Sequence, residues 1–155
     1  TAVQLQDGLW RGMVLAVTGS PGCPPAVTSS AEPMIGRAFD GNRIWSDPVV
    51  ATDFIDFGTA PENSYTNPEP NRYLVVTDIQ AEGLGSVSRL EYRFAVESAT
   101  FVSGQFFYSL NIPGVMECTV TTDISLEYIG SLDPNRPDLD LGRAGGAPGA
   151  GFPNS

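Results

Sequence analysis

Apolar and polar residues alternate along two long stretches of the chain, and a period of two is typical of β-strands. In the first stretch, Leu90–Glu97, every second residue is apolar and the positions between are mostly Glu or Arg. In the second, Cys118–Tyr128, Thr, Asp, Ser and Glu separate the residues of the apolar face. Each stretch therefore predicts a strand with one face on a core and the other in water.

Less regular stretches that are rich in apolar, β-branched or aromatic residues predict further strands. They are Leu9–Thr18, Met34–Phe39, Arg43–Trp45, Val49–Phe57, Tyr73–Gln80, Thr100–Val102 and Gln105–Ile112. Turns are expected at Asp40-Gly41-Asn42, Ser103-Gly104 and Pro113-Gly114, because Gly and Asn tolerate a positive φ and proline fixes φ. No window predicts a helix, since β-branched residues and the 13 prolines interrupt every candidate.

This succession of short strands and turns predicts an all-β protein, an antiparallel sandwich of about eight strands with a jelly-roll or immunoglobulin-like order. Gly8-Leu9-Trp10 resembles the short G-x-W signature with which lipocalins open their first strand. In that family the tryptophan closes the floor of the barrel against an arginine. The resemblance covers three residues, and it implies a closed calycin-like barrel as the alternative fold.

Two segments differ in composition from the predicted strands. Thr59–Arg72 is a long polar connection, and connections of this length are often functional. Residues 131–155 are rich in Pro, Gly, Asp and Asn and carry too few apolar residues to fold alone. We therefore predict one all-β domain over residues 1–130 and an extended tail over residues 131–155. The tail lies either against its own domain or along a neighbouring subunit, and we favour the neighbour.

The chain has two cysteines, Cys23 in a turn-rich segment and Cys118 at the start of a predicted strand. A bridge between them would close a loop of about 95 residues, worth roughly 4–5 kcal/mol in loop-closure entropy. We predict this disulfide and, with it, an oxidising extracytoplasmic location such as the periplasm, the cell surface or the medium. No signal peptide is visible at Thr1, so a secreted protein would be represented by its mature form.

The formal net charge is −10, and all eight basic residues are arginine. This balance disfavours nucleic acid and anionic membranes as partners, because there is no excess of cations to neutralise phosphates. The apolar stretch Met13–Val17 is too short to span a bilayer. Protein subunits, of the same or a different chain, are therefore the expected partners.

Histidine and lysine are both absent from the chain, which removes the usual proton carriers and nucleophile activators. There is also no G-x-S-x-G motif and no phosphate-binding loop. Carboxylates such as Glu91, Glu97 and Glu127 could in principle run glycoside hydrolysis, but strands ordinarily present such groups to water. We expect no catalytic activity and no cofactor.

Calcium is the one metal that the sequence suggests. Asp133, Asn135, Asp138 and Asp140 place four oxygen-bearing side chains within eight residues, and calcium prefers several oxygen ligands on a flexible loop. The spacing is not that of an EF-hand, and two prolines stiffen the segment. A solvated acidic linker is the competing interpretation.

The aromatic run Phe106-Phe107-Tyr108 is the main candidate for a contact surface, because consecutive residues of a strand point to opposite faces. One face of this run is expected to contact a partner, together with apolar residues of the tail. The predicted partner-binding residues are Phe106, Phe107, Tyr108, Leu139, Leu141 and Phe152. The protein is accordingly predicted to be a structural or assembly subunit of an envelope complex, surface layer or filament.

The alternative function is a secreted module that binds carbohydrate or another small ligand. Trp45 beside a turn and Tyr65 in the long polar connection are its candidate stacking residues. Both interpretations describe a protein that works through its surface rather than through a reaction.

Overall fold

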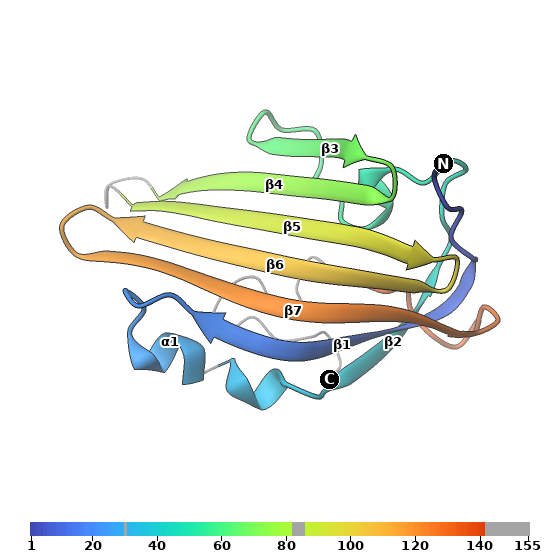
Figure 1. Cartoon of the computed structure of the whole chain (residues 1–155), viewed down its shortest axis with the longest axis horizontal. Coiled ribbons are helices and arrows are strands. Elements are labelled where there is room, and N and C mark those ends of the chain that lie inside the picture. Colours follow the sequence, from blue (N-terminus) through green and yellow to red (C-terminus); the bar gives the residue numbers. More distant parts are fainter. Residues whose placement is uncertain (30, 82–85, 142–155) are drawn as a thin grey trace.

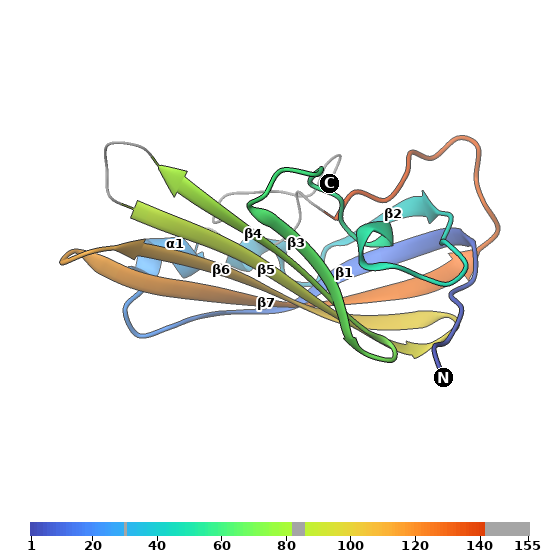
Figure 2. The ribbon, with the colours of Figure 1, turned by 90° about the horizontal axis from the view of Figure 1, so that it is seen from above.

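A computed structural model describes residues 1–29, 31–81 and 86–141 of the chain, without the side chains of residues 79–81, 86 and 87. Its strands form one antiparallel sheet (Figures 1 and 2). They are β1 (Gly8–Gly19), β2 (Ala38–Arg43), β3 (Asn63–Glu69), β4 (Arg72–Ala81), β5 (Ser86–Ser98), β6 (Phe101–Ile112) and β7 (Met116–Gly130). Three short helices complete the secondary structure of this part: α1 (Pro25–Ser29), η1 (Glu32–Met34) and η2 (Ala51–Asp53).

The strand order β2-β1-β7-β6-β5-β4-β3 is that of an up-and-down meander in which the first strand also pairs with the last. Only a β2–β3 ladder would be needed to close this order into a barrel. Within the described residues that ladder is missing, so β2 and β3 remain the two edges of an open sheet. The predicted all-β antiparallel class is therefore confirmed, whereas the alternative of a closed calycin-like barrel is wrong.

The inner face of the sheet carries the apolar positions that the alternation predicted. The register aligns Val14, Ile124, Gly104, Phe94 and Tyr73 across five neighbouring strands. All five are buried. Because the side-chain period of a strand is two, the intervening residues form a separate outer face.

Segments outside the strands supply the layer that covers this inner face. Figure 2 shows the connection between β2 and β3 and the segment that follows β7 on the same side of the sheet. Trp45 lies 5.4 Å from Trp10 and 5.0 Å from Phe54 between ring centres, and Phe54 stacks on Phe94 at 4.5 Å. The second layer of the core is thus built from loop aromatics, with Leu5, Leu139 and Leu141 buried beside them.

Two predicted boundaries at the edges of the sheet are wrong. Asp40-Gly41-Asn42 is not a turn but the middle of β2. Glycine is required there because a Cβ at Gly41 would lie 2.5 Å from the backbone of Leu139, which crosses the strand. The polar connection Thr59–Arg72 contains β3, whose Pro68 lies near its end, as is typical of an edge strand.

Three other local predictions also fail. Ser103-Gly104 lies inside β6, and Gly104 leaves room for Ile124, whose side chain would be 2.8 Å from an added Cβ. Val49–Phe57 contains η2 instead of a strand, because the Asp53 carboxylate accepts hydrogen bonds from the Val50 amide and the Ser46 hydroxyl at 2.8 and 2.7 Å. The five-residue helix α1 was not predicted. The turn at Pro113-Gly114 does separate β6 from β7.

The predicted disulfide between Cys23 and Cys118 is confirmed. It joins the turn after β1 to β7, across a sequence separation of 95 residues. The same turn is held by two hydrogen bonds: the Ser20 amide donates to the Thr119 carbonyl at 2.9 Å, and the Thr119 amide donates to the Ser20 hydroxyl at 3.0 Å. A disulfide with one buried cysteine is compatible with an extracytoplasmic location.

Removal of this bridge is expected to destabilise the protein strongly. The double variant Cys23→Ala/Cys118→Ala should lose about 4 kcal/mol of unfolding free energy, because its unfolded chain is no longer constrained. Urea unfolding of both proteins under oxidising conditions measures the difference. The wild type in excess reductant should approach the stability of the variant, and a loss below about 1 kcal/mol would contradict the entropic account.

Burial raises the pKa of Tyr92 to about 12, whereas an exposed tyrosine titrates near pH 10. The folded state therefore keeps a proton that the unfolded state loses, and stability should fall by roughly 2–3 kcal/mol as the pH rises from about 10 to about 12. Because the chain has no lysine, this range is free of the lysine titration that usually obscures it. Unfolding measured across the range should show a smaller fall for Tyr92→Phe than for the wild type, and equal losses would exclude Tyr92 as a cause.

Candidate functional site

An open groove of about 750 Å³ crosses the outer face of the sheet, opposite the aromatic core. The register places Leu74, Arg93, Gln105 and Asp123 in one row across β4, β5, β6 and β7. Leu15 of β1 lies at one end of the groove and Pro68 of β3 at the other. Arg72, Glu91 and Ser103 complete its polar lining.

Contacts between neighbouring side chains fix the positions of the polar groups in this groove. The Arg93 guanidinium donates to Glu91 at 2.5 Å, and Arg89 approaches the same carboxylate at 3.4 Å. The Gln105 amide donates to the Asp123 carboxylate at 3.1 Å. Because these pairs hold donors and acceptors side by side, the groove has both kinds of hydrogen-bonding group in place before any ligand binds.

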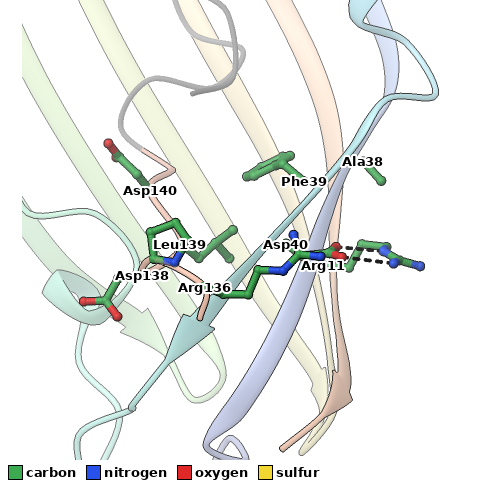
Figure 3. Close-up of a pocket in the computed structure, with 9 residues that line it drawn as sticks. Arg11, Ala38, Phe39, Asp40, Arg136, Asp138, Leu139 and Asp140 are labelled. Carbon is green, nitrogen blue, oxygen red and sulfur yellow. Dashed lines mark hydrogen bonds and ion pairs between the residues drawn. The ribbon is translucent and has the colours of Figure 1, made fainter. Parts of the chain in front are cut away.

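A second pocket, of about 430 Å³, lies between β2 and the segment that follows β7 (Figure 3). Arg11 donates two hydrogen bonds to Asp40, at 2.8 and 3.1 Å. These bonds lower the pKa of the Asp40 carboxyl below its ordinary value, and Arg136, which extends toward the pair in Figure 3, lowers it further. The pocket therefore brings the guanidinium groups of Arg11 and Arg136 toward the Asp40 carboxylate.

The polypeptide beside this pocket is held in place by Asn42. The Asn42 side-chain amide donates to the carbonyls of Asp133 and Arg136 at 2.6 and 2.9 Å, and its oxygen accepts from the Asp133 amide at 2.8 Å. The Asn42 backbone forms two more bonds, accepting from the Leu139 amide and donating to the Pro137 carbonyl, each at 3.0 Å. One residue of β2 thus fixes the segment from Asp133 to Leu139 along the edge of the sheet.

The four residues of the predicted calcium loop serve different purposes in the structure. Asp133 accepts a hydrogen bond from the amide of Asn135 at 2.9 Å, which closes a local turn. Asp138 and Asp140 are exposed, and Figure 3 shows both carboxylates directed away from the Arg11–Asp40 pair. In the described part of the chain, no group of three or more His, Cys, Asp or Glu side chains is arranged to hold a metal ion.

A third cleft, of about 420 Å³, lies beside Arg43 and includes Asp56, Asp138 and Asp140 in its lining. The Arg43 guanidinium donates to the Phe54 carbonyl at 2.6 Å and lies 5.7 Å from the centre of the Trp45 ring. Burial lowers the pKa of Arg43, while the charges of Asp53, Asp138 and Asp140 oppose that shift. Arg43 therefore joins the β2–β3 connection to the sheet.

The aromatic run predicted to contact a partner is divided between the two faces of β6. Phe106 is fully buried in the inner core, and Tyr108, on the same face, is half-buried. Phe107 is the one member of this run on the outer face, where the Arg93 guanidinium lies 4.5 Å from the centre of its ring. A cation already covers the outward-facing aromatic ring.

The remaining predicted site residues that the structure describes pack or form hydrogen bonds within their own chain. Trp45 is 5% exposed within the aromatic core. The Tyr65 hydroxyl accepts from the Phe57 amide and donates to the Gly58 carbonyl, each at 2.8 Å. Leu139 and Leu141 are 3% and 1% exposed in the core of their own chain, so these side chains are not presented to a partner. Phe152 lies outside the described residues.

Sequence reasoning did not identify the groove residues Arg72, Arg93, Gln105 and Asp123. Each occupies an outward position of an alternating strand, which on its own indicates solvent exposure. Their proximity depends on the register of four strands, and the strand order could not be derived from the chain. Pairing the predicted strands β5, β6 and β7 residue by residue would have placed Arg93, Gln105 and Asp123 opposite one another.

Comparison with known proteins adds no identification, because no protein-family model, curated protein or solved structure matches the chain. No helix in the described ranges is long and apolar enough to cross a membrane.

Replacing Asn42 is expected to release the segment from Asp133 to Leu139 from β2. Asn42→Ala removes three side-chain hydrogen bonds and should cost about 2 kcal/mol of unfolding free energy. Urea unfolding measures the cost, and hydrogen exchange at the Leu139 amide should accelerate in the same variant. Asn135→Ala, at an exposed side chain of the same segment, is the matched control; equal effects of the two variants would refute the anchoring role.

Proposed function

We propose that the protein is a non-catalytic assembly subunit of an extracytoplasmic complex, and that it joins a neighbouring subunit by strand addition at β3. The observation that carries this proposal is the difference between the two edges of the sheet. β2 is bonded to its own chain at Asn42, whereas β3 forms its ladder with β4 alone within the described ranges. Figure 1 shows β3 at the outer limit of the sheet.

The cover on β2 is made of backbone hydrogen bonds. Residues Pro137 and Leu139 bond to Asn42, and Asp138 forms an isolated parallel bridge with the same residue. An exposed strand edge is a template for pairing with another chain, and proteins ordinarily protect it. The chain protects β2 in this way, which makes the uncovered β3 edge the natural position for a partner strand.

The first half of β3 has none of the features that usually block strand addition. Asn63–Thr66 contains no proline and no charged residue, and it is paired in regular register with β4. Pro68 and Glu69, which do oppose pairing, are confined to the end of the strand, where the register shifts. The edge thus offers a partner the carbonyls of Asn63 and Tyr65 and the Tyr65 amide, since the Asn63 amide donates to Ala60.

Charge favours a different subunit over a second copy of the same chain. Each chain has a formal net charge of −10, so two copies repel one another. Glu62, exposed immediately before β3, adds negative charge beside the edge. The partner that fits is therefore an extended segment of another protein with Lys or Arg near the pairing residues.

The chemistry of the chain supports both the location and the absence of catalysis in this proposal. The Cys23–Cys118 bridge suits an oxidising compartment. The absence of histidine and lysine leaves carboxylates as the only ordinary acid–base groups near neutral pH. A role that depends only on contact with another protein requires neither histidine nor lysine.

Hydrogen exchange on the complex purified from its native source tests the proposal directly. In the isolated protein the Tyr65 amide should exchange quickly because it points away from β4, whereas the Asn63 amide on the same edge already donates to the Ala60 carbonyl at 3.0 Å. In the complex the Tyr65 amide should slow by at least about tenfold, as expected for a new backbone hydrogen bond. Tyr65→Pro should abolish complex formation because it removes this amide. Tyr65→Ala, which loses the same side-chain hydrogen bonds to Phe57 and Gly58 but keeps the amide, should retain the complex.

The matched control is proline at an exposed position outside the strands, Ser131→Pro, which should leave the complex intact. A native protein that purifies alone would contradict the proposal. A complex in which the β3 amides exchange at the free-protein rate would also contradict it, because the contact would then lie elsewhere.

A further inference from the structure

We infer that the outer groove binds a neutral, hydroxyl-rich oligomer, such as an oligosaccharide. This function is separate from assembly at β3, because the row at the centre of the groove lies on β4, β5, β6 and β7. The volume of about 750 Å³ falls within the range of ligand-binding pockets. Glu91 is the one groove residue that the sequence patterns singled out, as a carboxylate on an outward strand face.

The dimensions of the groove favour an extended ligand. Its lining runs from Leu74 on β4 to Leu15 on β1, across four inter-strand spacings. Neighbouring strands lie about 4.8 Å apart, so the groove is roughly 19 Å wide in this direction. A single sugar ring would leave most of it empty, whereas an oligomer laid across the strands would contact the whole row.

The order of polar groups suits hydroxyls in particular. A hydroxyl donates one hydrogen bond and accepts two, so it needs donors and acceptors at neighbouring positions. The groove supplies donors from Arg72, Arg93 and Gln105. The acceptor oxygens of Glu91 and Asp123 lie beside these donors, with Glu91 next to Arg93 and Asp123 next to Gln105. A hydroxyl at either of these two pairs would therefore meet both kinds of partner.

The charges of the groove balance, which argues against an ionic ligand. Arg72 and Arg93 contribute two positive charges, and Glu91 and Asp123 contribute two negative charges. An anionic polymer would meet both carboxylates and the net charge of −10 of the chain. A cationic polymer would meet two guanidinium groups inside the groove. A neutral ligand avoids both penalties.

Apolar surface at the ends of the row matches the C–H faces of sugar rings. Leu15 is 51% exposed at one end of the groove and presents an aliphatic surface there. Leu74 and Pro68 provide apolar surface at the other end. Since Arg93 covers Phe107, contact with the ligand is expected from aliphatic side chains rather than from aromatic stacking.

A glycan array that presents neutral, sulfated, uronic-acid and amino oligosaccharides tests the inference, followed by calorimetric titration with the best neutral oligomer and its monosaccharide. We expect binding to neutral oligomers, at least tenfold weaker binding of the monosaccharide, and no hydrolysis of the bound oligomer. Gln105→Ala and Asp123→Ala should each weaken binding at least tenfold.

Asn111→Ala is the matched control, because Asn111 is exposed on the same face of β6 but lies outside the groove; its affinity should equal that of the wild type. Gln105 and Asp123 both lie on the outer face, and unchanged unfolding curves would confirm that Gln105→Ala and Asp123→Ala fold. The inference is overturned if no neutral glycan binds, if only charged glycans bind, or if Gln105→Ala and Asn111→Ala bind equally well. None of these outcomes bears on assembly at β3, because the isolated protein is used throughout.

Discussion

The structure depends on how the chain fills the gap between β2 and β3. An up-and-down meander whose first and last strands pair would close into a barrel if these two strands met, but the connection between them inserts Trp45 and Phe54 against the inner face instead. Truncating a buried aromatic of this size ordinarily costs roughly 3–5 kcal/mol. That is a large fraction of the total stability of a domain, so this packing outweighs any single ion pair at the surface, which is worth about 1 kcal/mol or less.

The open sheet leaves two surfaces for function. Packing of the loop layer on the inner face buries the aromatics that the sequence suggested as contact residues, including Phe106 and Trp45. The outer face keeps an ordered row of paired polar groups, and within the described residues the β3 edge pairs with no further strand. Because Asn42 anchors the segment after β7 along β2, the free edge is β3. The two proposed functions follow from these separate surfaces.

The sequence predicted those features that depend on local pattern. The alternation in β5 and β7 identified their buried faces residue by residue, and the positions of Cys23 and Cys118 identified the bridge. It failed where a distant segment decides the local structure. Gly41 resembles a turn residue, yet it is glycine because Leu139 crosses it. β3 resembles a polar loop because an edge strand with little burial needs no apolar alternation. The groove required the strand order, which no local pattern contains.

The central claim is that the chain closes one edge of its sheet and leaves the other open. Residue-resolved hydrogen exchange of the isolated protein compares the two edges in one experiment. The account predicts that the amides of Asn42 and Leu139 exchange slowly, while the outward-pointing amide of Tyr65 in β3 exchanges fast. Uniformly slow exchange along β3, or fast exchange at both Asn42 and Leu139, would contradict it.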